Sequence, residues 1–180
     1  MMRFLLSLLA CTVLSTGEAA SLTDLVLPDH RGGTCKLDTV RDRLLMYFRT
    51  GERTTAKRCD QVLSKRLGPE RPLVRVIDGR EHAREDRETL IRRIAETVGD
   101  EPITFLLDWD GLVAKRLSLP DSPLLCLGIA ADGSINGIAP CAYDRESLGR
   151  ILPLLPALDQ SAFTIEELTP VKRPSRETRR

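Results

Sequence analysis

The sequence predicts an α/β domain in which a mixed central sheet of about four to five strands is flanked by helices in a three-layer sandwich. An unbroken apolar run at 44–48 is followed by a polar loop and an amphipathic helix, and further apolar runs at 73–77 and 124–130 alternate with helical patterns. A short apolar run without polar alternation is typical of a strand that is buried on both faces of an α/β sheet. The length of 180 residues suits one domain with a substantial core.

The first twenty residues have the pattern of a secretory signal peptide. A basic start at Arg3 is followed by an apolar run over 4–14, and small residues near Ala19 suit a signal peptidase. The run is too short for a transmembrane segment, which needs about 20 apolar residues. We therefore expect residues 1–20 to be cleaved and the mature protein to be periplasmic or secreted. The alternative is a lipoprotein anchored through Cys11, because the residues before it loosely resemble a lipobox.

Export would place the remaining four cysteines in an oxidising compartment. They are Cys35, Cys59, Cys126 and Cys141. An even number of cysteines in an oxidising compartment favours disulfides, and four cysteines allow three pairings among which the sequence does not choose. No two cysteines have the C-x-x-C spacing, and His30 and His82 lie far from any cysteine pair in the sequence. We therefore expect no metal ion and no cofactor.

The first elements are expected to be a turn at 27–33 and a short edge strand at 34–37 that carries Cys35. The central strand then runs into the polar loop 49–55, in which Thr54 and Thr55 are candidate N-caps. The helix after the loop presents one apolar stripe, and a Gly-Pro pair ends it. The stripe consists of Ala56, Cys59, Val62, Leu63 and Leu67.

The next elements continue the alternation of strands and helices. The strand at 73–77 is expected to be parallel to the central strand if the helix between them is a right-handed crossover. A second helix ends near Val98, and its many charged residues are typical of a face exposed to solvent. An extended segment at 103–107 then closes in an Asp-Trp-Asp-Gly turn, followed by one or two helical turns over 112–117.

A hairpin and a final helix complete the expected domain, which spans residues 21–158. Strands at 124–130 and 135–138 are joined by an Ala-Asp-Gly-Ser turn and are expected to be antiparallel. The final helix is expected to start near Asp144, a good N-cap. Residues 159–180 lose the apolar pattern and become basic, which is typical of a disordered tail, with contact to an acidic lipid or partner as the alternative. The overall formal charge of +1 argues against a nucleic-acid-binding surface.

The order of these elements resembles the thioredoxin-like fold in its peroxiredoxin and redoxin branch. The segment 105–114, Phe-Leu-Leu-Asp-Trp-Asp-Gly-Leu-Val-Ala, is similar to the part of that branch that precedes the last β-hairpin, and 124–135 is similar to the hairpin itself. Pro123 stands where the family carries a cis-proline beside its active site. The segment 53–57, Arg-Thr-Thr-Ala-Lys, also resembles the YtfJ-like exported proteins.

The sequence departs from the family at the active site. The thioredoxin C-x-x-C positions fall on Arg53 and Ala56, and the peroxiredoxin position falls near 55–57, where no cysteine stands. This chemistry requires a thiol at a helix N-terminus, where free amides and the helix dipole lower its pKa. Cys59 comes later, on the apolar stripe, where burial raises the pKa. We therefore expect Cys59 to be a buried apolar residue or a disulfide partner. The alternative is a reactive thiolate, because basic residues lie near Cys59 in the sequence.

Polar residues remain at the expected helix start. Arg53, Thr54 and Thr55 would face Ser122 and Pro123 if the resemblance holds, and hydroxyls, backbone amides and a guanidinium can together bind a carboxylate or another small anion. The other interpretation is plain helix capping by a threonine.

The sequence is thus more consistent with a non-catalytic, exported binding or accessory module than with an enzyme, and its partner would be a protein, a peptide or a small anion. The alternative is an atypical thiol-disulfide oxidoreductase or thiol peroxidase that works through Cys59, with Cys35, Cys126 or Cys141 as the resolving partner. Cys126 and Cys141 are candidates for a disulfide, since one lies on a hairpin strand and the other just after its partner strand.

Overall fold

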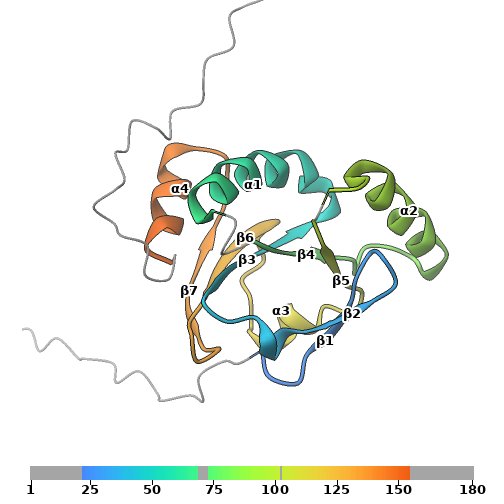
Figure 1. The fold of residues 1–180 in the computed structure, drawn as a ribbon, viewed down its shortest axis with the longest axis horizontal. Helices are drawn as coiled ribbons and strands as arrows, with labels where there is room; N and C mark the ends of the chain where they lie inside the picture. Colours follow the sequence, from blue (N-terminus) through green and yellow to red (C-terminus); the bar gives the residue numbers. More distant parts are fainter. Residues whose placement is uncertain (1–21, 69–72, 102, 155–180) are drawn as a thin grey trace, which may run out of the picture.

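A five-stranded mixed sheet forms the centre of the molecule, with helices on both of its faces (Figure 1). The computed structural model describes residues 22–68, 73–101 and 103–154, and the strand order of the sheet is β5-β4-β3-β6-β7. The expected signal peptide at 1–20, with Cys11, and the expected tail at 159–180 lie outside the described residues.

The predicted central strand is confirmed as β3, Arg43–Arg49. Its residues 44–48 are all buried, as the unbroken apolar run requires. On one side β3 pairs in parallel with β4, Val74–Asp78, and on the other it pairs antiparallel with β6, Leu124–Ile129. The mixed sheet predicted from the sequence is therefore built around this strand.

Two further strands form the edges of the sheet. β5, Phe105–Asp108, is parallel to β4, and β7, Ile135–Pro140, is antiparallel to β6, as the hairpin pattern predicted. A hairpin turn joins β6 to β7, in which the Asp132 carboxylate accepts the backbone N–H of Ser134 at 2.8 Å.

A separate two-stranded sheet consists of β1, Val26–Pro28, and β2, Thr34–Lys36, in antiparallel pairing. The predicted edge strand is confirmed as β2, but the prediction of a turn over 27–33 was too long at its start, since Leu27 and Pro28 belong to β1. The turn is confined to 29–33 because the Asp29 carboxylate accepts the backbone N–H groups of Arg31 and Gly33, at 2.7 and 2.8 Å.

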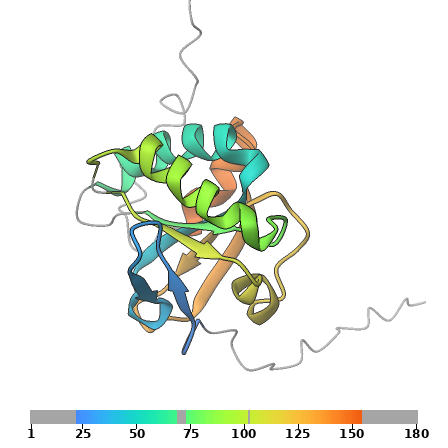
Figure 2. The same cartoon turned by 90° about the vertical axis from the view of Figure 1, so that its right-hand side faces the viewer.

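The helices lie on opposite faces of the sheet (Figures 1 and 2). α1, Arg53–Leu67, α2, Arg87–Val98, and α4, Arg145–Ile151, cover one face, while the short α3, Leu112–Arg116, lies on the other face with β1 and β2. Within the described ranges, no helix combines the length and the apolar character needed to cross a membrane.

The alternation of side chains along β3 divides the core into two clusters. Leu44, Met46 and Phe48 pack with the apolar stripe of α1 and with buried residues of α2 and α4. Leu45 and Tyr47 pack with α3 and with the β1–β2 sheet on the other face. The predicted stripe of α1 is confirmed, with Ala56, Cys59, Leu63 and Leu67 buried; Val62 is partly buried.

The start of α1 differs from the prediction that Thr54 or Thr55 is its N-cap. A 3-10 turn over Thr50–Glu52 leads directly into the helix, and the Arg53 amide donates to the carbonyl of Thr50. Glu52 is consequently the N-cap, without a side-chain hydrogen bond, and both threonines lie inside the first helical turn. The prediction for α4 is confirmed, since the Asp144 carboxylate accepts the Ser147 N–H at 2.8 Å.

A buried ion pair joins α1 to β4. Arg75, which is 7% exposed, donates from Nη2 and Nε to the two carboxylate oxygens of Asp60, at 2.6 and 3.2 Å, and from Nη1 to the carbonyl of Leu73 at 2.8 Å. Such a two-point contact fixes both the distance and the orientation between helix and strand.

Replacing Arg75 with alanine should destabilise the protein by about 3 kcal/mol, because the Asp60 carboxylate would keep its mostly buried position without its partner. Urea unfolding followed by circular dichroism measures this difference. Arg150→Ala is the matched control, since its pair with Glu146 is exposed on α4 and should contribute little. Equal unfolding midpoints for Arg75→Ala and the wild type would contradict the role of the pair.

Candidate functional site

Three charged residues end three neighbouring strands in register. Arg49 of β3 lies opposite Asp78 of β4, and Asp78 lies opposite Asp108 of β5. Because these strands are parallel, their carboxyl ends meet at one edge of the sheet, which is the edge where open α/β folds bind ligands. We call it the carboxyl edge.

Asp78 is held by the side chain of Arg80 at this edge. Asp78 is 2% exposed, and its carboxylate accepts hydrogen bonds from Arg80 Nε at 2.9 Å and from Arg80 Nη2 at 2.7 Å. Burial alone would raise the pKa of Asp78, but the hydrogen bonds and the positive charge of Arg80 outweigh burial and lower the pKa. Asp78 is therefore an anion that needs Arg80 as its counter-ion.

Asp108 attaches α3 to the carboxyl edge. It is fully buried and accepts the backbone N–H groups of Leu112 at 2.7 Å and Val113 at 2.9 Å, which begin α3. It also accepts the hydroxyl of Tyr47 at 3.3 Å. Burial raises the pKa of Asp108, although these three hydrogen bonds counteract part of the rise. Burial, followed by the nearby Asp108 charge, raises the pKa of Tyr47, so its hydroxyl keeps its proton and remains a donor.

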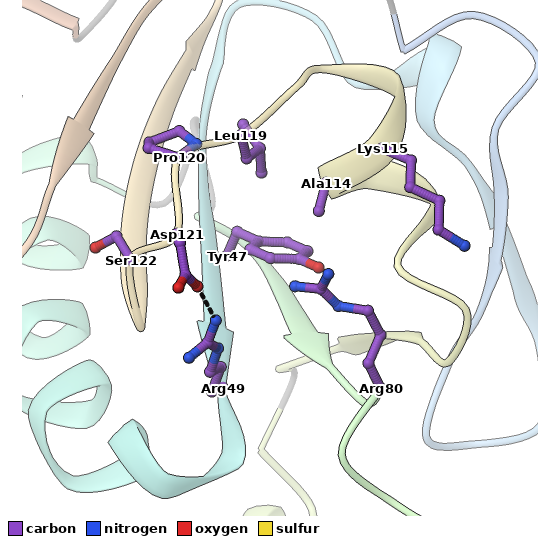
Figure 3. A pocket seen from close by; sticks show the side chains of 9 residues that line it. All are labelled: Tyr47, Arg49, Arg80, Ala114, Lys115, Leu119, Pro120, Asp121 and Ser122. Atoms are coloured by element: carbon purple, nitrogen blue, oxygen red, sulfur yellow. Dashed lines mark hydrogen bonds and ion pairs between the residues drawn. The ribbon is translucent and has the colours of Figure 1, made fainter.

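A cavity of about 270 Å³ opens beside Tyr47 on the α3 face of the sheet (Figure 3). Its walls are the end of β3, Ala114 and Lys115 of α3, and the loop 119–122 that leads to β6. Figure 3 shows the Arg80 guanidinium beside the Tyr47 hydroxyl, with the Arg49 side chain paired to Asp121 at the mouth. The cavity has room for a small group and is not large enough to enclose a nucleotide-sized cofactor.

Positive charge predominates in the lining of this cavity. Arg49, Arg80 and Lys115 contribute cations, and Asp121 contributes a carboxylate. Arg49 contacts both Asp121 and Glu81, whereas Arg80 is occupied by Asp78. Arg49 and Lys115 are thus the cations best placed to meet an incoming anion, since both belong to the lining and neither pairs with a buried carboxylate.

The structure brings only part of the predicted binding residues together. Ser122 lines the cavity, and the carbonyl of the adjacent Pro123 accepts the Arg49 N–H at 2.9 Å. Arg53, Thr54 and Thr55 lie in the first turn of α1 and do not line the cavity.

Pro123 stands where the family carries a cis-proline, and here the structure departs from the family. The described residues contain no cis peptide bond, so the bond before Pro123 is trans, the form that X–Pro bonds prefer.

Three of the four predicted disulfide cysteines lie together in the core cluster on the α1 face of the sheet, the face opposite the cavity. Cys59 and Cys126 are fully buried and Cys141 is 5% exposed, and the Sγ atoms of Cys59 and Cys141 are 2.8 Å apart. The contact with Cys141, together with burial, raises the pKa of the Cys59 thiol. Cys35 is half-buried on β2 and packs against the core of the opposite face. Within the described ranges, no group of three or more His, Cys, Asp and Glu side chains is arranged to hold a metal ion.

The sequence analysis missed Tyr47, Arg49, Arg80 and Lys115 as lining residues, and also missed the role of Asp108. A signal was present, because Asp78 and Asp108 each follow a buried apolar run directly, where the carboxyl ends of parallel strands meet. The cavity residues carry no such signal, since they come from four separate segments that only the fold brings together.

Replacing Arg80 with glutamine should raise the pKa of Asp78, because burial then acts without the opposing guanidinium. In the wild type the lowered pKa stabilises the fold above the unfolded-state pKa of about 3.9, and this stabilisation is lost as the pH falls through the folded-state value. Acid unfolding of Arg80→Gln should therefore occur at higher pH, which carboxyl ¹³C NMR titration of Asp78 can check directly. An unchanged Asp78 titration would contradict the pairing, and Arg150→Gln serves as the control.

Comparisons with known proteins identify the fold. No protein-family model matches the sequence, and no curated protein matches it significantly. Among solved structures, an exposed lipoprotein thioredoxin of Streptococcus pneumoniae aligns with a TM-score of 0.56 at 14% identity, covering 73% of this chain and 98% of that one.

Two disulfide-exchange proteins align in the same way. A secreted disulfide oxidoreductase of Mycobacterium tuberculosis, homologous to DsbE, gives a TM-score of 0.52 at 15% identity, over 79% of this chain and 100% of that one. A putative thiol:disulfide interchange protein DsbE of Chlorobium tepidum gives a TM-score of 0.54 at 16% identity, over 75% of this chain and 95% of that one. Such likenesses establish the fold and leave the activity open. The chain therefore has a thioredoxin-like fold, the fold of these disulfide oxidoreductases.

Proposed function

We propose that this protein is an exported, non-catalytic thioredoxin-fold module that binds a peptide or protein partner through a carboxylate at the carboxyl edge of its sheet. The observation that carries the proposal is that cationic and hydroxyl side chains, rather than a pair of cysteines, are found at this edge. By the family resemblance the C-x-x-C positions fall on Arg53 and Ala56, and cationic and hydroxyl side chains line the adjacent cavity. Export is supported by the signal-peptide pattern of residues 1–20 and by similar structures that belong to a secreted protein and to an exposed lipoprotein.

The cysteines support a non-catalytic role. A thiol that exchanges disulfides with another protein must be exposed, with a pKa low enough to supply the thiolate. Cys59 has neither property, because it is fully buried and its pKa is raised. The first turn of α1, whose N–H groups would activate a thiol in an oxidoreductase, contains no cysteine.

The cavity supports carboxylate recognition. Lys115 is exposed at its rim, Arg49 already pairs with the exposed carboxylate of Asp121, and Ser122 adds a hydroxyl. A partner carboxylate can replace Asp121 at Arg49 without leaving a buried charge unpaired, because the Asp121 side chain is 87% exposed. The volume suits one side chain or a chain terminus, which favours a peptide segment over a larger ligand.

The first turn of α1 is the second candidate position for the same carboxylate. Its N-cap residue Glu52 makes no side-chain hydrogen bond, and Arg53 and Thr54 are exposed beside it. Helix N-termini attract anions through their free amides. A partner that spans both positions would cross the end of β3, where Arg49 and Pro123 are hydrogen bonded.

A thiol-disulfide oxidoreductase or peroxidase that works through Cys59 remains the second candidate function. The short Cys59–Cys141 sulfur contact favours it, since a catalytic thiol needs a resolving partner nearby. This function would require α1 to move and expose Cys59, because the thiol is fully buried in the present conformation.

The protein should not accelerate the reduction of insulin disulfides by dithiothreitol above the uncatalysed rate, as followed by turbidity. The double variant Arg53→Cys/Ala56→Cys is the matched positive control, because it places C-x-x-C at the start of α1, where the first-turn amides can stabilise a thiolate. The proposal fails if the wild-type protein accelerates the reaction and Cys59→Ala abolishes the effect.

Peptide binding can be measured by ¹H–¹⁵N NMR titration with a mixture of short peptides that carry a free terminal carboxylate, compared with the same mixture amidated. The carboxylate form should perturb the signals of Arg49, Lys115 and Ser122, and Lys115→Gln should weaken binding roughly fivefold. Lys65→Gln, in the last turn of α1, is the matched control and should have no effect.

The titration also separates the two candidate positions. Loss of binding in Arg53→Gln, with Lys115→Gln unaffected, would move the site from the cavity to the first turn of α1. Equal binding of the free and amidated peptides would contradict carboxylate recognition at either position.

A further inference from the structure

Three buried cysteines from three different segments meet on the α1 face of the sheet. Cys59 lies in the second turn of α1, Cys126 lies in the middle of β6, and Cys141 directly follows β7. All three belong to the same core cluster, which also contains Phe48 and Leu148. Apolar packing alone requires no sulfur at these three positions, so we asked whether two of the thiols are placed to form a bond.

One pair within this group is far closer than packing requires. The Sγ atoms of Cys59 and Cys141 are 2.8 Å apart. Even carbon atoms, which are smaller than sulfur, make their best non-bonded contact at roughly 3.5–4.0 Å. Two thiols that merely pack together would therefore stand farther apart, whereas a bonded pair needs only a further approach of roughly 0.8 Å.

We propose that Cys59 and Cys141 form a disulfide in the mature protein, which fastens α1 to the segment between β7 and α4. The two thiols give up two electrons and two protons to an external disulfide of the oxidising compartment, which is thereby reduced to two thiols. The exchange passes through a mixed disulfide and leaves one new Sγ–Sγ bond in this chain. It takes place during folding, before Cys59 is enclosed by the core.

The geometry favours the Cys59–Cys141 pairing over the others, since theirs is the short sulfur contact, although Cys126 also lies close enough to Cys141 to raise the pKa of that thiol. Cys35 packs into the core cluster on the opposite face of the sheet, so the sheet itself separates Cys35 from the three buried cysteines. Cys126 lies directly opposite Ala139 in the β6–β7 ladder, so Cys141 is its diagonal neighbour. Diagonal neighbours stand about 7–8 Å apart between Cα atoms, beyond the usual disulfide range of about 4.4–6.8 Å. In the proposed pairing, Cys35 and Cys126 are the two cysteines that remain thiols.

The bond would join two elements whose cysteines are 82 residues apart in the sequence. α1 follows the central strand, and Cys141 leads into α4, whose buried residues Leu148 and Ile151 lie in the same cluster. Closing so long a loop restricts the unfolded chain strongly, which is the main way in which disulfides stabilise proteins. This proposal rests on the proposed export to an oxidising compartment and does not depend on carboxylate binding at the carboxyl edge.

The pairing can be mapped on full-length protein that is produced with its leader and collected from an oxidising compartment. Free thiols are blocked with N-ethylmaleimide in denaturant without reductant, and the digest is analysed by mass spectrometry. Trypsin releases Cys59 in the peptide 59–65, but it leaves Cys126 and Cys141 together in 117–145. A second cleavage on the N-terminal side of Asp132 separates them.

The expected result is a linked pair of peptides that carry Cys59 and Cys141, with Cys35 and Cys126 blocked by maleimide. Four blocked cysteines, or any other linkage, would overturn the proposal.

Thermal unfolding gives an independent readout. Reduction should lower the midpoint of the wild type by roughly 10 °C, given the length of the loop that the bond closes. Cys35→Ser and Cys126→Ala should respond to reductant as the wild type does, whereas Cys59→Ala and Cys141→Ala should not respond. A wild-type midpoint that is insensitive to reductant would also overturn the proposal.

Discussion

The position of β3 at the centre of the sheet is the constraint on which the rest of the structure depends. This strand pairs with β4 on one side and β6 on the other, and residues 44–48 are buried by layers on both faces. Its alternation sends Met46 and Phe48 towards α1 and sends Tyr47 towards α3. The register of β3 with β4, and of β4 with β5, then fixes where Arg49, Asp78 and Asp108 meet.

Two buried carboxylates, Asp78 and Asp108, therefore lie at the carboxyl edge. Buried carboxylates are tolerated there because each has a specific partner: Arg80 neutralises Asp78, while backbone amides and the Tyr47 hydroxyl satisfy Asp108. The same contacts hold α3 in place and shape the cavity beside Tyr47. In an oxidoreductase this edge activates an exposed thiol. Here Cys59, Cys126 and Cys141 are instead buried in the core cluster beneath α1.

The elements with long apolar patterns were predictable from the sequence, and the contacts between distant segments were not. The run at 44–48, the stripe of α1 and the hairpin of β6 and β7 follow from periodicity and turn chemistry. The N-cap prediction at Thr54 and Thr55 failed because a 3-10 turn, which has no distinctive sequence signal, extends into α1. The cavity and the approach of Cys59 to Cys141 arise from tertiary packing, so spacing along the chain could not reveal them.

The central claim is that this thioredoxin-like domain carries no reactive thiol at its carboxyl edge. The most direct measurement is the rate at which each cysteine of the fully reduced, folded protein is alkylated at neutral pH, resolved by mass spectrometry. The account predicts that Cys35, which is half-buried, reacts while the protein is folded, and that Cys59, Cys126 and Cys141 react only on unfolding. Rapid alkylation of Cys59 in the folded protein would contradict the claim and support the redox enzyme.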